Sequence, residues 1–207
     1  MVKVKICGIT NLEDAIYAQE AGADFLGFVF AKSPRRIEPE KAKEIIGRIS
    51  ERVNIVALFV NERKDIVHDI GCKLGRVDFL QFHGDETPEY CGHFSGKKII
   101  KAFRVKDKES INRIENFSSV DYALLDGYSE KTYGGTGKGF DLDLALKAKE
   151  FDVPIFLSGG LNPDNVKQAA EKVMPYCVDV SSGVEIRPGK KDHALVRRFI
   201  NNVKGKI

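Results

Sequence analysis

The chain has 207 residues, of which 43% are hydrophobic and 30% charged, so we expect one globular domain over residues 1–207 and exclude disordered and fibrous classes. Its 33 basic and 30 acidic residues are interleaved to a net charge of +3, which gives nucleic-acid binding little electrostatic support. No apolar run is long enough to span a membrane and the first residues lack the apolar core of a signal peptide, so we expect a cytoplasmic protein without membrane association.

Short β-rich runs recur along the chain, with amphipathic, helix-like stretches between them. The predicted strands are Val2–Cys7, Phe25–Phe30, Ile55–Val60, Phe79–His83, Ile99–Phe103, Tyr122–Asp126, Ile155–Ser158 and Val178–Ser181. The clearest predicted helices are Leu12–Ala21, Pro39–Ile49, Asn162–Val173 and His193–Val203. Asn11 and Gly22 give start and stop signals for the first helix, and Asn162 followed by Pro163 gives a start signal for the third.

Strict alternation of strands and helices predicts a parallel sheet covered by helices. Eight such units favour a closed, single-domain (β/α)8 TIM barrel, with a doubly wound open sheet as the alternative. The active site of a barrel lies at the carboxyl ends of its strands. The reactive side chains of this sequence lie at those positions, which supports the barrel as the frame of a site.

Cys7 and Asp126 end the first and sixth predicted strands and are the candidate acid–base residues. Alternation along the first strand points Lys5 and Cys7 into the barrel, where a neighbouring cation lowers the pKa of a thiol and produces a thiolate base. A carboxyl group in a pocket that excludes water, as expected for Asp126, stays protonated and acts as an acid. The alternative is an inert buried thiol and a structural, salt-bridged aspartate, and spacing alone does not decide between the two.

Two further charged side chains are predicted to face inward. Asp179 alternates with Val178 and Val180, which predicts an ion pair with Lys5 across the adjacent first and eighth strands, with a structural role as one interpretation. Lys101, on the fifth predicted strand, is expected to face inward for the same reason. As a Schiff-base nucleophile it would support an aldolase, which is the main rival chemistry.

Arg35 and Arg36 follow the second predicted strand, where a guanidinium group can hold a substrate carboxylate through two hydrogen bonds. The alternative for either arginine, considered alone, is a solvent-exposed charge in a loop with no role in binding. His83 ends the fourth strand and is a candidate polar contact or proton carrier. His68 and His93 lie away from the strand ends, and the four cysteines lack zinc-ligand spacing, so we expect no metal site.

Glycine-rich segments follow the sixth, seventh and eighth predicted strands. The last two predict a phosphate cradle, since glycine lets backbone N–H groups approach a dianion and barrels bind phosphate there; simple tight turns are the alternative. The predicted phosphate-binding residues are Gly159, Gly160, Ser181, Ser182 and Gly183. The earlier cluster predicts a mobile lid, with a surface loop as the alternative. Its glycines are Gly134, Gly135 and Gly137.

At these residues the sequence resembles the phosphoribosylanthranilate isomerases, enzymes of tryptophan biosynthesis. Each matching motif is short, but together they run in order from one end of the chain to the other, which makes the resemblance specific. The matching segments are Val4–Thr10, Gly27–Phe30, Ser33–Ile37, Leu58–Asn61, Gln81–Gly84, Leu124–Asp126, Tyr133–Lys138, Leu157–Pro163, Val178–Glu185 and Pro188–Asp192.

The resemblance implies an Amadori rearrangement that converts N-(5-phosphoribosyl)anthranilate into 1-(2-carboxyphenylamino)-1-deoxyribulose 5-phosphate without a metal or cofactor. It implies Cys7 as the general base and Asp126 as the general acid. The arginine that faces the anthranilate carboxylate falls on Arg35, with Arg36 as its neighbour. We therefore expect a small phosphosugar as the substrate, with His83 and Asp179 among its contacts, and a monomer or homodimer.

Two other functions stay open on the sequence. Another phosphosugar barrel, either an epimerase or an aldolase that uses Lys101, is the rival enzyme. A catalytically silent phosphate-binding subunit is the alternative from a different class. Such a subunit has no need of both Cys7 and Asp126, which favours the isomerase.

Overall fold

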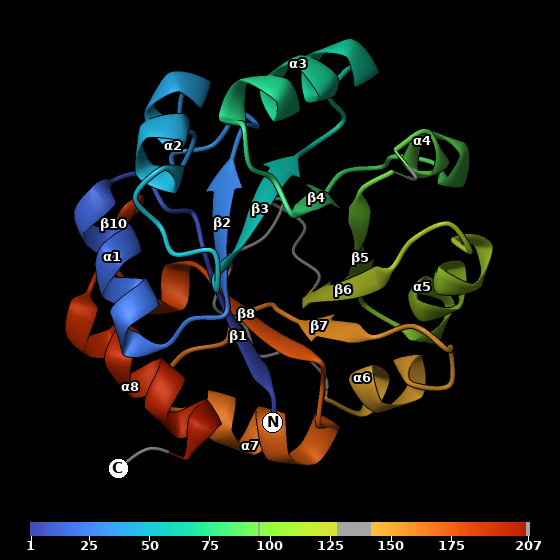
Figure 1. The fold of residues 1–207 in the computed structure, drawn as a ribbon. Coiled ribbons are helices and arrows are strands. Elements are labelled where there is room, and N and C mark those ends of the chain that lie inside the picture. Colours follow the sequence, from blue (N-terminus) through green and yellow to red (C-terminus); the bar gives the residue numbers. More distant parts are fainter. Residues whose placement is uncertain (95, 128–141, 206–207) are drawn as a thin grey trace.

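The computed structural model describes residues 1–94, 96–127 and 142–205, and its strands form a closed parallel barrel with helices around the outside (Figure 1). The barrel strands are β1 (Lys3–Cys7), β2 (Phe25–Val29), β3 (Asn54–Phe59), β4 (Phe79–Phe82), β5 (Lys98–Val105), β6 (Tyr122–Gly127), β7 (Ile155–Leu157) and β8 (Cys177–Val180). Strands pair in chain order, and β1 pairs with β8 to close the ring. The predicted (β/α)8 barrel is therefore confirmed, and the open sheet is excluded.

Helices cover the barrel between its strands and after the last one (Figure 1). They are α1 (Leu12–Ala21), α2 (Pro39–Ile46), α3 (Lys64–Leu74), α4 (Pro88–Gly92), α5 (Lys108–Asn112), the 3-10 helix η1 (Arg113–Asn116), α6 (Leu142–Ala148), α7 (Val166–Val173), the 3-10 helix η2 (Ser182–Val184) and α8 (His193–Lys204). An antiparallel hairpin of β9 (Glu185–Arg187) and β10 (Lys190–Lys191) precedes α8. Within the described ranges, no helix has the length and apolar character needed to cross a membrane.

The first helix has the ends that its sequence predicts. Asn11 Oδ1 accepts a hydrogen bond from the backbone N–H of Asp14 at 2.9 Å, which satisfies a donor that the first turn leaves open. Gly22 ends α1 with a φ of 103°, a conformation that glycine adopts without strain. The second helix ends at Ile46, earlier than the predicted Ile49.

The start of α7 differs from the prediction. The helix begins at Val166 instead of Asn162. The Asn162 side chain accepts hydrogen bonds from the backbone N–H groups of Asp164 and Asn165, at 2.8 and 3.2 Å. Asn162 therefore closes a turn that delays the helix, which is a common local use of asparagine.

Apolar side chains fill the part of the barrel interior near the amino-terminal ends of its strands. This inner core contains Phe25, Val56, Phe79, Ile100, Ala102, Leu124, Phe156 and Cys177. The ring of Phe25 lies 5.3 Å, centroid to centroid, from the rings of both Phe79 and Phe156. Burying side chains of this size contributes roughly 1.5–3 kcal/mol each, so this end of the barrel serves stability and the opposite end carries the polar residues.

Candidate active site

Polar side chains occupy the barrel interior toward the carboxyl ends of the strands. The strand register places Lys5 opposite Asp179 and Arg104 opposite Asp126. Because side chains alternate along a strand, these residues share the inner face with the apolar core below them. This end of the barrel thus gathers charged residues from strands that are far apart in sequence.

A continuous array of hydrogen bonds crosses this end of the barrel. Lys5 Nζ lies 3.1 Å from Asp179 Oδ1 and 2.8 Å from Gln81 Oε1. Gln81 Nε2 lies 2.8 Å from His83 Nδ1, and His83 Nε2 lies 3.1 Å from Asp126 Oδ2. The predicted Lys5–Asp179 ion pair is confirmed, and the array joins it to His83 and Asp126.

Lys5 remains charged although it is fully buried. Burial opposes the ammonium form, but the attraction of Asp179 and Cys7 and the hydrogen bond to Asp179 together outweigh it and raise the pKa of Lys5 above its usual value. Breaking a buried pair by removing one partner is costly, because an uncompensated charge is left in the interior. Lys5 is therefore a permanent cation inside the barrel.

Cys7 is buried next to this cation, with 6% of its surface exposed. Burial raises the pKa of the Cys7 thiol, and the attraction of Lys5 and Lys191 offsets this only in part. The neighbouring cation was predicted, but the predicted lowering of the thiol pKa is wrong in this structure, because desolvation outweighs the cation. Gly27 makes room for the thiol, since a Cβ there would lie 2.8 Å from Cys7 Sγ.

An ion-pair cluster holds Arg35 near the carboxyl end of β1. The Arg35 guanidinium binds Glu185 through two contacts, Nη2 to Oε2 at 2.7 Å and Nε to Oε1 at 2.9 Å. Lys191 Nζ binds the same carboxylate at 2.9 Å and the carbonyl oxygen of Cys7 at 2.5 Å. Burial opposes the charge of Glu185, but hydrogen bonds from Arg35 and Lys191 outweigh it and lower its pKa. The stem of Arg35 packs over Gly8, where a Cβ would lie 2.7 Å from its Cδ.

Arg36, the other candidate arginine, takes a different direction. Its side chain is 54% exposed and pairs with Glu38 at 3.5 Å. An exposed pair of this kind contributes little to stability or recognition. The structure therefore places Arg35, and not Arg36, in the cluster that contacts Cys7.

The loops that follow β7 and β8 pack against each other through glycine. A Cβ at Gly183 would lie 2.0 Å from the carbonyl oxygen of Leu161, so a larger residue does not fit. Gly159 and Gly160 have φ values of 90° and 71°, which glycine tolerates. Ser181 Oγ is buried without a hydrogen-bond partner among the residues that the structure describes. The structure thus brings together the two loops that the sequence predicts as a phosphate cradle.

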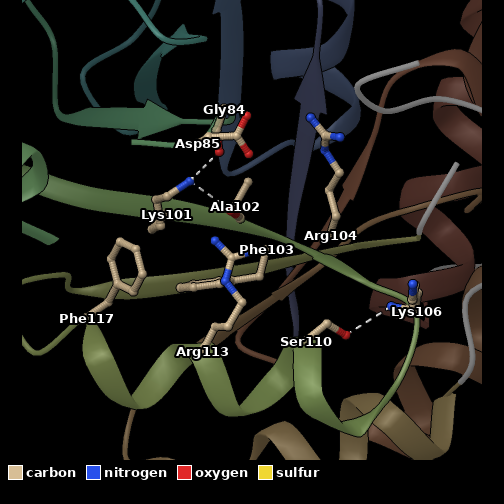
Figure 2. Close-up of a pocket in the computed structure, with 10 residues that line it drawn as sticks. All are labelled: Gly84, Asp85, Lys101, Ala102, Phe103, Arg104, Lys106, Ser110, Arg113 and Phe117. Carbon is tan, nitrogen blue, oxygen red and sulfur yellow. Dashed lines mark hydrogen bonds between the residues drawn. The ribbon is translucent and has the colours of Figure 1, made fainter. Parts of the chain in front are cut away.

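Lys101 does not face the barrel interior, so that prediction is wrong. On β5 the neighbouring Ala102 belongs to the inner core, and Lys101 lies on the outer side of the strand. Its Nζ binds the carbonyl oxygen of Gly84 at 2.8 Å and Glu86 Oε2 at 3.1 Å (Figure 2 shows the side chain turned toward Gly84). Burial lowers the pKa of Lys101 against the attraction of Glu86, but the amine lies away from the inner array, so its position gives Schiff-base chemistry no support.

A cavity of about 250 Å³ lies beside Lys101, between the end of β5 and the α5–η1 segment (Figure 2). Arg113 and Phe117 are among its walls, whereas Cys7 and Asp126 do not line it. Arg104, which lies opposite Asp126 in the strand register, also lines it. The predicted lid glycines lie outside the described residues; they are Gly134, Gly135 and Gly137.

Three residues that complete the site were not singled out from the sequence. Gln81 carried a usable signal, since it alternates with His83 and so shares the inner face of a buried strand. Glu185 and Lys191 lie in segments that carry the family resemblance, but their contacts were not predictable, because the β9–β10 hairpin brings Glu185 to Arg35 across 150 positions of sequence and Lys191 to Glu185. No local pattern predicts such a contact.

Comparisons with known proteins agree with this arrangement. Residues 4–202 match a family model described as N-(5'phosphoribosyl)anthranilate (PRA) isomerase. An N-(5'-phosphoribosyl)anthranilate isomerase from Geotalea uraniireducens is 54% identical over 206 residues, which cover 99% of this chain and 100% of that relative.

Solved structures give the same result. The phosphoribosyl anthranilate isomerase of Thermotoga maritima superposes with a TM-score of 0.93 at 43% identity, covering 99% of this chain and 100% of the other. A phosphoribosyl anthranilate isomerase in complex with reduced 1-(o-carboxyphenylamino)-1-deoxyribulose 5-phosphate superposes with a TM-score of 0.90 at 42% identity, over the same shares of the two chains. The likeness therefore extends over the whole barrel, including every strand end described above.

Proposed function

The chain belongs to the N-(5'-phosphoribosyl)anthranilate isomerase family, enzymes of tryptophan biosynthesis, and from this premise we propose how its own residues catalyse the reaction. Asp126 acts as the general acid and Cys7 as the general base of an Amadori rearrangement. The observation that carries this assignment is their placement. Both lie buried on the inner face at the carboxyl end of the barrel, Asp126 bound to His83 and Cys7 beside Lys5.

The rearrangement needs one proton donor and one proton acceptor. Asp126 gives its proton to the ribose ring oxygen, the bond between that oxygen and C1' breaks, and the nitrogen lone pair forms an iminium ion. Cys7 then removes the proton from C2', and the electrons of that C–H bond form the double bond of an enolamine. Loss of the 2'-hydroxyl proton and protonation of C1' give the ketone product. Each positioned group contributes about 10²- to 10⁴-fold to the rate.

The two glycine loops are proposed to hold the substrate phosphate. Gly159 and Gly160 in the β7 loop support this, because both have backbone conformations that favour glycine. In the β8 loop, support comes from the close packing at Gly183 and from the buried hydroxyl group of Ser181. Ser182 lies between Ser181 and Gly183 and begins η2. Binding energy from a remote phosphate positions the sugar at the acid and the base. The phosphate thereby raises the rate without taking part in the chemistry.

Arg35 is proposed to bind the anthranilate carboxylate. Its guanidinium is fixed by Glu185, and Glu185 is fixed in turn by Lys191, so little side-chain freedom remains to be lost on binding. The contact of Lys191 with the Cys7 carbonyl group places this cluster next to Cys7. The aromatic ring of the substrate would then lie near the base.

Arg35→Ala is expected to lower kcat/KM by about ten- to a hundredfold, because a hydrogen bond to a charged group contributes roughly 1.5–3 kcal/mol. Most of the loss should appear in KM, since the carboxylate does not change charge during the reaction. Arg36→Ala is the matched control and should leave both constants near those of the wild type. Equal effects of the two substitutions would contradict the assignment of Arg35.

The proposed reaction is tested by turnover of freshly prepared phosphoribosylanthranilate. The wild-type protein is expected to change the fluorescence of the anthranilate ring in proportion to enzyme concentration, without added metal or cofactor. Mass spectrometry should show a product of unchanged mass, and borohydride reduction should reveal its new ketone. No turnover, or a product of different mass, would overturn the proposal.

A further inference from the structure

Lys5 fixes the orientation of the Gln81 amide. Gln81 is fully buried between Lys5 and His83. An ammonium group only donates hydrogen bonds, and Asp179 keeps Lys5 in that form. The Gln81 atom 2.8 Å from Lys5 Nζ is therefore the carbonyl oxygen, and the NH2 group faces the imidazole of His83.

The orientation of the Gln81 amide determines which ring nitrogen of His83 carries the proton. The Gln81 amide donates to His83 Nδ1 at 2.8 Å, so this nitrogen accepts and carries no proton. The ring proton is then on Nε2, which donates to Asp126 Oδ2 at 3.1 Å. The opposite tautomer, or an imidazolium ion, would set an N–H group of His83 against the N–H groups of Gln81.

This tautomer decides which oxygen of Asp126 carries the acid proton. Oδ2 accepts from His83, so the proton of the carboxyl group sits on Oδ1. Oδ1 lies toward the β7 loop, where a Cβ on Gly159 would be 3.0 Å from it. With the opposite tautomer, Nε2 would accept a hydrogen bond and hold the proton on Oδ2, away from the proposed phosphate loop.

We infer that Gln81 is a positioning residue that imposes the Nε2–H tautomer on His83 and so directs the acid proton of Asp126 to Oδ1. The inference rests on the proposed role of Asp126 as general acid. It gives Gln81 and His83 the task of orienting that acid. The charged groups linked to the imidazole are Asp126 from β6 and, through Gln81, Lys5 from β1 and Asp179 from β8.

The wild-type protein provides the first test. Nitrogen-15 NMR of protein labelled at histidine should show His83 with an unprotonated Nδ1 and a protonated Nε2. The chain has four histidines, and the spectrum of a His83→Ala variant identifies the resonances. A protonated Nδ1 in the wild-type protein would overturn the inference without any change to Gln81.

Gln81→Glu is the second test. The carboxylate keeps the shape of the amide and still binds Lys5, but it accepts from His83 Nδ1 instead of donating to it. The expected result is a protonated Nδ1 and a kcat lower by about 10- to 100-fold, the scale of losing a supporting partner, with little change in KM. Gln168→Glu, at an exposed position of α7, is the matched control and should change neither.

The outcomes separate this inference from the proposed function. An unchanged His83 tautomer in the Gln81→Glu protein, or a changed tautomer with wild-type kcat, would overturn the role of Gln81. Full activity in an Asp126→Asn protein would instead overturn the acid role of Asp126, whatever the tautomer. A purely structural role for Gln81 would lower thermal stability without moving the Nδ1 resonance.

Discussion

Asp126→Asn is expected to lower kcat by about 10²- to 10⁴-fold, the contribution of one positioned general acid. The amide has the size of the carboxyl group, and its oxygen still accepts the hydrogen bond from His83 Nε2. The array across the barrel is therefore kept, and only the transferable proton is lost. Ring opening then lacks its proposed donor, while the proposed phosphate and carboxylate contacts are unchanged, so KM should move little.

The measurement is the initial rate of fluorescence change with freshly prepared substrate. Asp164→Asn is the matched control, because Asp164 is 74% exposed in its side chain and pairs only with Arg198 among the contacts described for it. Both variants should unfold at nearly the wild-type temperature. Wild-type activity in Asp126→Asn would assign the acid to another group.

Two strands show why some side-chain directions were predictable and others were not. On β1 the predicted inward direction of Lys5 gave the ion pair with Asp179, which the register and a distance of 3.1 Å confirm. On β5 both faces are buried, with Ala102 in the inner core and Phe103 in the outer one. Both faces of β1 are buried as well, but its charged residues Lys3 and Lys5 share one face, whereas Lys101 and Arg104 of β5 are three positions apart and lie on opposite faces. Alternation on β5 therefore does not show which face points inward, and the direction of Lys101 was predicted wrongly.

Two further features of the site, the partner of Arg35 and the pKa of Cys7, could not be predicted from local sequence. Glu185, which lies on the distant β9–β10 hairpin, binds Arg35, and this contact supports the proposed choice of Arg35 over Arg36. The sign of the pKa shift at Cys7 depends on the balance between burial and a neighbouring cation, and burial is a property of the folded barrel. Sequence therefore predicted the Lys5–Asp179 pair, whereas the partner of Arg35 and the pKa shift of Cys7 depend on the folded barrel.

Cys7→Ser is expected to lower kcat by about 10²- to 10⁴-fold, because a serine hydroxyl group holds its proton far more tightly than a thiol and cannot act as the base. The substitution is nearly isosteric, so the space left by Gly27 stays filled and the fold should be kept. Cys72→Ser, at an exposed position of α3, is the matched control and should retain wild-type activity. Full activity in Cys7→Ser would make the thiol an inert buried group and require a different base.

The raised pKa of Cys7 makes a second prediction about the same thiol. In the free protein its thiolate should appear only above about pH 8.5, the ordinary value for cysteine, and the difference in ultraviolet thiolate absorbance between wild type and Cys7→Ser measures this. A thiolate at neutral pH in that experiment would contradict the effect of burial.

A mostly protonated Cys7 is compatible with its proposed role as base, because the proposed acid–base pair needs only one proton between its two members. In the working form that proton is on Asp126, and moving it there from Cys7 takes no proton from solvent. The fraction of working enzyme then does not change with pH as long as the pair holds one proton, so kcat/KM should be flat with pH through neutrality. A tenfold rise per pH unit through neutrality, roughly the slope of a single titrating base, would show instead that the rate follows the Cys7 thiolate alone and does not require a proton on Asp126.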